Sequence, residues 1–187
     1  MSRVCLADVA GHGETVAAIG RELHAHLRES VDVVDERKVF ARLNTRLDRR
    51  ALASMTTAVL ATYYPPRRRL TVSYAGHPSG WLYRAALRRW EVLARPMPPP
   101  AHRPAFVDLP LGVRLPSTYT RHRFAVAPGD RMLLITDGVL ETTSRDDAPF
   151  DTHGVEALLN LDLGPAGPAE PCEHLANRLI TALHEHA

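Results

Sequence analysis

The stretch VCLADVAGHGETVAA, residues 4–18, contains the change of pattern that decides the fold. A short apolar run over residues 3–7 ends at Asp8 and a glycine-rich turn, which is typical of a buried strand that leads into a loop. From Glu14 onward, apolar side chains recur at helical spacing, at Val16, Ile19, Leu23 and Leu27. This spacing predicts an amphipathic helix. The beginning of the chain therefore predicts a strand, a tight turn and a helix.

The rest of the chain indicates segregated helices and strands. A second apolar set at helical spacing over residues 39–47 predicts another helix. Residues 55–64 and 70–84 are rich in β-branched and aromatic residues and predict strands of an antiparallel meander, with turns at residues 65–66 and 76–80. The proline-rich residues 94–104 predict a surface loop, after which the sheet resumes in pieces over residues 110–136. Helices around residues 155–159 and 171–183 complete an order that indicates an α+β fold.

Composition bounds the class of protein. The chain has 187 residues, 45% of them apolar and 24% charged, which fits one globular domain. The formal net charge of +2 argues against nucleic acid as a partner. Two cysteines without a CxxC-like spacing favour a reducing compartment, and no stretch reaches the roughly 18 apolar residues that a membrane span needs. We expect a soluble, cytoplasmic protein that binds neither nucleic acid nor membrane.

Two aspartates stand at the ends of predicted strands. The runs VCLADVAG and MLLITDG both stop at an aspartate and then turn, so Asp8 and Asp137 converge if their strands are neighbours. Carboxylate and carbonyl oxygens are the ligands that Mg²⁺ and Mn²⁺ take in proteins. The alternative is that each aspartate only shapes a turn or caps a helix, which is common at such positions.

The string HGET, residues 12–15, offers a competing interpretation. Histidine phosphatases resemble it in having RHGE after a strand, where the histidine is the nucleophile and the arginine holds the phosphate. Here Gly11 stands at the arginine position, so the charge-assisted fork that orients a phosphoryl group is missing. The sequence therefore favours DVAGHG, residues 8–13, as the chemical motif.

The motifs taken in order resemble the metal-dependent protein phosphatases, the PPM family, in the branch of SpoIIE and RsbU. The matching segments are ADVAGHG (7–13), LNTRL (43–47), MTTAVLATYYPPRRRLTVSYAGHP (55–78), LPLGV (109–113), PGDRMLLITDGVLET (128–142) and GVEALL (154–159). The resemblance implies an αββα sandwich of two antiparallel sheets flanked by helices, as one domain over residues 1–187. It also implies hydrolysis of phosphoserine or phosphothreonine by a water that two Mn²⁺ or Mg²⁺ ions activate.

The resemblance also implies roles for individual residues. Asp8 matches the aspartate that bridges the metals, the Val9 carbonyl the backbone ligand beside it, and Asp137 a ligand of the second metal. His12 stands near the site by motif position and could protonate the leaving alkoxide. His77 is expected to lie in a turn without a catalytic role.

Two charged clusters have a surface interpretation. Residues 67–69, three arginines, are expected at a solvated hairpin tip that could meet an acidic partner. Asp146 and Asp147 are expected to be solvated in a loop.

Two motifs of the family branch are absent from this chain. A GGDWYD-like first strand and a DDxTLL-like last strand, each with a metal-ligating aspartate, have no counterpart. We therefore expect either a truncated chain, whose terminal strands are missing, or a homodimer in which a second copy covers the sheet edges.

The expected function is dephosphorylation of a regulatory protein such as an anti-sigma-factor antagonist, as in sigma-factor partner switching. A degenerate, non-catalytic binding module is the alternative.

Overall fold

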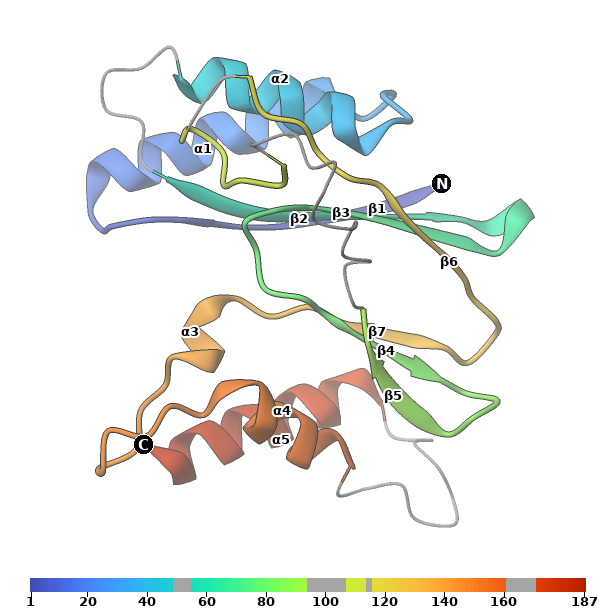
Figure 1. The fold of residues 1–187 in the computed structure, drawn as a ribbon, viewed down its shortest axis with the longest axis vertical. Helices are drawn as coiled ribbons and strands as arrows, with labels where there is room; N and C mark the ends of the chain where they lie inside the picture. The colour runs from blue at the N-terminus through green and yellow to red at the C-terminus, as the bar shows by residue number, and fades with distance from the viewer. Residues whose placement is uncertain (49–54, 94–106, 114–115, 161–170) are drawn as a thin grey trace, which may run out of the picture. The chain divides into compact units, whose positions relative to one another are not determined.

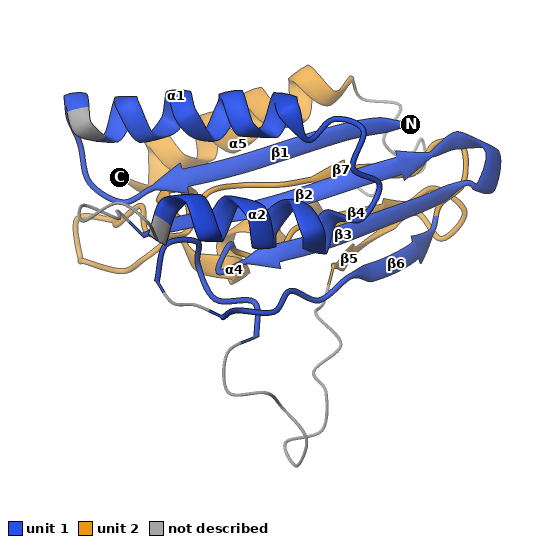
Figure 2. Cartoon of the chain, turned by 90° about the horizontal axis from the view of Figure 1, so that it is seen from above, with its two compact units in different colours: residues 1–77, 95–125 blue, residues 78–94, 126–187 orange. Residues whose placement is uncertain are grey.

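The chain forms two compact units in a computed structural model that describes residues 1–48, 55–93, 107–113, 116–160 and 171–187. Unit 1 comprises residues 1–77 and 95–125, and unit 2 comprises residues 78–94 and 126–187 (Figure 2). Both units are discontinuous in sequence, because the chain leaves unit 1, returns to it and leaves it again. Whether they act as the single predicted domain stays a prediction. The loop predicted at residues 94–104 lies outside the described residues.

Unit 1 contains a four-stranded antiparallel sheet in the order β1-β2-β3-β6. Its strands are β1 (Ser2–Val9), β2 (Thr56–Tyr64), β3 (Arg69–Ala75) and β6 (His122–Ala125). The 3₁₀ turn η1 (Pro65–Arg67) joins β2 to β3. Its prolines favour this turn, because the proline ring fixes φ near the helical value. The predicted hairpin with its turn at residues 65–66 is thereby confirmed.

Two helices cover one face of this sheet, α1 (Glu14–Glu29) and α2 (Glu36–Asp48) (Figures 1 and 2). Their apolar stripes are the ones that the helical spacing predicted, and they pack with alternate residues of the strands in a buried core. The core includes Ile19, Leu23, Val39, Phe40, Leu43, Leu47, Ala58, Leu60 and Ala75.

The described residues of unit 2 form a three-stranded antiparallel sheet in the order β5-β4-β7 and three helices. The strands are β4 (Trp81–Arg84), β5 (Arg89–Val92) and β7 (Arg131–Leu133), and the helices are α3 (Asp137–Leu140), α4 (Asp151–Asn160) and α5 (Cys172–His186). A buried cluster joins the sheet to α4 and α5, with Trp81, Ile135, Val155, Leu159 and Leu179 at its centre. Both C-terminal helices are confirmed.

The predicted meander is wrong at its second turn. Strands β3 and β4 flank residues 76–80 but belong to different sheets, so this segment crosses between units instead of closing a hairpin. The crossover depends on long-range pairing, since β4 pairs with β5 and with β7, which comes about 50 residues later. Along the described part of the chain, no helix combines the length and the hydropathy needed to span a membrane.

Candidate metal centre

Asp8 and Val9 are the last two residues of β1, so a paired strand holds both in place. In the ladder to β2, Asp8 lies opposite Thr57 and Val9 opposite Thr56. Side chains alternate along a strand, and Ala7 and Val9 pack into the core beneath the helices, so Asp8 points to the other face of the sheet. Strand β1 extends beyond the apolar run over residues 3–7 from which it was predicted, because its pairing with β2 continues through Val9.

A buried histidine lies beside this end of the sheet. Its Nδ1 atom lies 3.0 Å from the hydroxyl oxygen of Thr57, the ladder partner of Asp8, and the whole His77 residue is buried. The sequence did not single out Thr57, because only the register of β1 against β2 shows that it neighbours Asp8. The expectation that His77 has no catalytic role stays a prediction.

Gly76 brings His77 to this position. Its φ of +69° lies in the left-handed region that favours glycine, and its N–H donates to the Asp108 carbonyl at 2.8 Å. A Cβ atom at this position would lie only 2.4 Å from Cγ of Pro110. The motif AGHP therefore requires glycine for both its backbone conformation and the close approach of Pro110.

Two further motif segments meet at the same end of unit 1. The fully buried Asn44 of LNTRL accepts a hydrogen bond from the N–H of Gly112, at 2.8 Å, through its Oδ1 atom. The neighbouring Leu111 exchanges two backbone hydrogen bonds with Thr56, at 2.8 and 3.1 Å. Because Thr56 is also the partner of Val9, the segment LPLGV is fastened next to the end of β1.

The loop over residues 10–13 connects β1 to α1. Gly11 and Gly13 have φ values of +104° and +93°, which side chains with a Cβ rarely adopt. His12 stands between them and is exposed to solvent. Its position leaves the imidazole accessible to a bound molecule, and its role as a proton donor stays a prediction.

Asp137 is the first residue of α3 in unit 2, not the end of a strand as predicted. The run MLLIT forms a strand only up to Leu133, because β4 begins at its ladder partner Trp81 and offers no further residues for pairing. The Asp137 side chain is half-buried and forms no hydrogen bond or ion pair with any residue that the structure describes. A half-buried carboxylate without a protein partner is suited to a cation.

The predicted ligands are all hard oxygen donors, which fits Mg²⁺ or Mn²⁺. Asp8 and Val9 belong to unit 1 and Asp137 to unit 2, and the relative position of the units is not determined, so the convergence of the two carboxylates stays a prediction. Within the described ranges, no group of three or more His, Cys, Asp and Glu side chains is arranged to hold a metal ion.

The order of these motifs matches one known family along almost the whole chain. The protein-family model described as Stage II sporulation protein E (SpoIIE) matches residues 2–187. The chain belongs to the SpoIIE family. This family consists of PPM-type, metal-dependent serine/threonine phosphatases, so the resemblance expected from the motifs is confirmed. Membership favours DVAGHG over HGET as the chemical motif of residues 8–15.

Solved structures share the fold of this SpoIIE-family chain. The PP2C domain of SiaA from Pseudomonas aeruginosa superposes with a TM-score of 0.74 at 19% identity, covering 98% of this chain and 68% of that one. The RsbU and RsbW domains of Rv1364c from Mycobacterium tuberculosis give 0.75 at 20% identity, covering 99% and 48%. RsbX in complex with magnesium gives 0.63 at 13% identity, covering 99% and 73%.

These superpositions confirm the predicted fold class, a PPM phosphatase-like α+β fold with two antiparallel sheets and helices. A search of curated proteins finds no match to the chain.

Proposed function

We propose that this chain is a divalent-metal-dependent phosphatase that hydrolyses phosphoserine or phosphothreonine on a protein. The observation that carries the proposal is the SpoIIE-family match over residues 2–187, which includes both aspartates predicted as ligands. Support comes from the place of Asp8 in the paired strand β1 and from the half-buried carboxylate of Asp137, which has no partner among the described residues. The SpoIIE-fold relative RsbX binds magnesium, which supports Mg²⁺ or Mn²⁺ as the cofactor.

Each residue has a defined task in this proposal. Asp8, the carbonyl of Val9 and Asp137 would hold the cations. Divalent cations bound there would lower the pKa of a bound water, so that hydroxide is available at neutral pH to attack a phosphoryl group. The exposed His12, on the loop that follows β1, would deliver a proton to the departing serine or threonine oxygen.

The proposed substrate is a phosphorylated regulatory protein of a partner-switching system in the cytoplasm. Support comes from Rv1364c, which contains an RsbU domain together with an RsbW domain. An anti-sigma-factor antagonist is the type of protein that fits this setting. A homodimer, in which a second copy covers sheet edges, is part of the same proposal.

The test is phosphate release from a phosphoserine peptide with and without Mn²⁺, using the wild-type chain, Asp8→Asn and Asp137→Asn. We expect release to require Mn²⁺ and to fall at least about 100-fold in either variant, since metal stabilisation of the developing charge amounts to several kcal/mol. Asp146→Asn is the matched control, because this exposed aspartate lies in the loop after α3. Mn²⁺ binding followed by electron paramagnetic resonance gives a second readout that does not need turnover.

Three results would contradict the proposal. Release that persists in EDTA and disappears in His12→Ala would indicate histidine-phosphatase chemistry. Folded protein that neither binds Mn²⁺ nor releases phosphate, yet binds a phosphoprotein, would indicate the non-catalytic binding module. Equal losses in Asp146→Asn and Asp137→Asn would show that the effect is not specific to the proposed ligands.

A further inference from the structure

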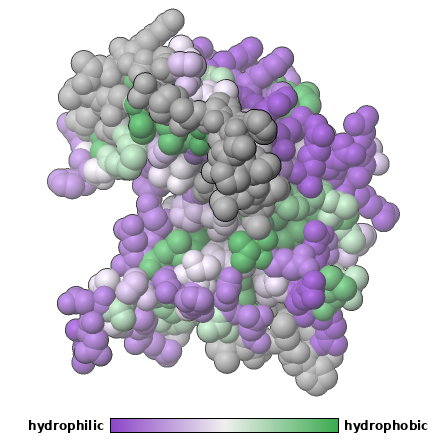
Figure 3. Space-filling view, in the orientation of Figure 1, coloured by the Kyte–Doolittle hydropathy of each residue, from purple (hydrophilic) through white to green (hydrophobic). Residues whose placement is uncertain are grey.

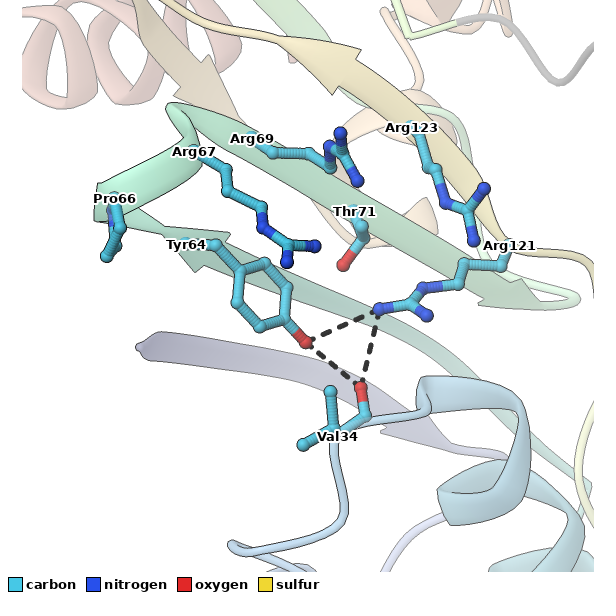
Figure 4. A pocket seen from close by; sticks show the side chains of 8 residues that line it. All are labelled: Val34, Tyr64, Pro66, Arg67, Arg69, Thr71, Arg121 and Arg123. Atoms are coloured by element: carbon cyan, nitrogen blue, oxygen red, sulfur yellow. Dashed lines mark hydrogen bonds between the residues drawn. The ribbon is translucent and has the colours of Figure 1, made fainter.

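A pocket rich in arginine lies at the end of unit 1 that carries the β2–β3 hairpin, whereas Asp8 and Val9 lie at the opposite end of the same sheet. It has a volume of about 390 Å³ and is bordered by η1, β3, β6 and the turn between α1 and α2. Hydrophilic residues gather over this end of unit 1 in the space-filling view (Figure 3). Four of the lining residues are arginines, and their side chains surround Thr71 (Figure 4): Arg67, Arg69, Arg121 and Arg123.

The strand register explains why these arginines share one pocket. Arg123 lies opposite Thr71 in the ladder between β3 and β6, and Arg69 precedes Thr71 by two residues, so their side chains lie on the same face. Arg67 reaches the pocket from η1, and Arg121 lies two residues before Arg123. Residues about 50 positions apart in sequence thus form a single cationic site.

The positive charge of the pocket is mostly uncompensated. Arg121 forms an ion pair with the fully buried Glu36, with 2.8 Å between Nε and Oε2. Arg67, Arg69 and Arg123 have no carboxylate partner among the residues that the structure describes. The lining therefore carries a surplus of three guanidinium charges, and guanidinium groups bind phosphate oxygens through paired hydrogen bonds.

The base of the pocket is held by a hydrogen-bond network. The Thr71 hydroxyl donates to Oε1 of Glu36 at 2.7 Å, and the Tyr64 hydroxyl donates to the Val34 carbonyl at 3.0 Å. Arg121 makes longer contacts to that carbonyl and to the Tyr64 hydroxyl, at 3.5 and 3.4 Å (Figure 4). This network positions Arg121 and the α1–α2 turn, so the pocket has a fixed side on which a ligand can rest.

We propose that this pocket binds a polyphosphate group, either as an inorganic chain or as part of a nucleoside polyphosphate. The three guanidinium groups without a carboxylate partner among the described residues are complementary to an anion that carries several charges close together, and linked phosphates do so. A peptide would have to place three acidic side chains in the same small volume. The site is independent of the proposed function, because it contains none of Asp8, Val9, His12 and Asp137.

Isothermal titration calorimetry with tripolyphosphate and with a nucleoside triphosphate tests the proposal, in 0.15 M salt and with EDTA so that metal does not contribute. We expect wild-type binding that weakens at least about 10-fold in the double variant Arg69→Gln/Arg123→Gln, which removes two guanidinium groups from the pocket. The matched control is Arg21→Gln/Arg42→Gln, which removes the same net charge from exposed positions of α1 and α2. We expect its affinity to stay within about twofold, because exposed charges outside the pocket are screened at this salt concentration.

The two ligands distinguish the source of the phosphates. Similar affinity for both supports an inorganic chain, and much tighter binding of the nucleoside triphosphate supports a nucleotide. Absence of binding of either ligand to the folded wild-type chain overturns the proposal, as do equal losses in the two double variants. It is also overturned if an acidic or phosphorylated peptide binds the same arginines more tightly than tripolyphosphate, since the pocket would then be a protein-docking site.

Discussion

Replacement of Gly76 by alanine should destabilise the chain strongly, although it adds only one methyl group. At a φ of +69° the added Cβ costs about 1–2 kcal/mol in backbone strain. The same Cβ would lie 2.4 Å from Cγ and 2.8 Å from Cδ of Pro110, and overpacking of this kind costs about 1–3 kcal/mol more. Relief by movement is restricted, because the Gly76 N–H donates to the Asp108 carbonyl at 2.8 Å. We therefore expect the free energy of unfolding to fall by about 2–5 kcal/mol.

Gly20→Ala provides a control with the same chemical change and the opposite expected sign. Gly20 lies within α1, where an added Cβ would meet no described atom within 4 Å apart from its chain neighbours and the helix's own backbone. Alanine favours the helical conformation over glycine by about 0.5–1 kcal/mol, so this variant should be more stable than the wild type. Urea unfolding followed by circular dichroism measures both changes. The reasoning is refuted if Gly76→Ala unfolds within about 0.5 kcal/mol of the wild type, or if Gly20→Ala is destabilised.

Three further outcomes test separate features of the structure. Glu36→Gln should lower the free energy of unfolding by about 3 kcal/mol, because it leaves the Arg121 guanidinium without its buried counter-charge, and an unchanged urea midpoint would contradict this. A thiol reagent at neutral pH should modify only Cys172 in the native chain, since burial raises the pKa of Cys5 to about 12, and rapid labelling of both would be inconsistent. A hydrogen bond from the Arg37 guanidinium lowers the pKa of Asp35 to about 2 from its usual 3.8. The stabilisation of the folded state by the Asp35 carboxylate is therefore complete above about pH 4 and is lost as the pH falls towards 2. Solvent screening keeps that contribution below about 1 kcal/mol, and an Asp35→Asn variant with the same acid dependence as the wild type would count against it.

Local periodicity predicted the helices well. The apolar stripes that define α1 and α2 could be found in the sequence because each residue on the buried face recurs at the helical repeat. The β2–β3 hairpin was equally visible, since prolines mark its turn. The second turn was predicted wrongly, because residues 76–80 have the composition of a hairpin turn but connect different sheets.

The candidate site was predictable only where a motif carried it. Asp8 and Asp137 were found from runs that end in an aspartate, yet the sequence placed Asp137 at a strand end, whereas it begins a helix. That Thr57 lies beside Asp8 could not be predicted, because it depends on the register of β1 against β2. The arginine pocket was partly visible as a basic hairpin tip, but its other half comes from β6, and no local pattern links Arg123 to Thr71.

The order in which the units are encoded constrains how they can be made. Strand β6 of unit 1 pairs with β3, but the ribosome synthesises residues 78–94 of unit 2 between them. On the nascent chain, strands β1, β2 and β3 can pair with one another, with α1 and α2 already synthesised, before β6 is synthesised. Unit 1 therefore stays incomplete while the first part of unit 2 emerges. Neither unit can therefore be expressed as an uninterrupted fragment, and a stop codon near residue 94 would leave both incomplete.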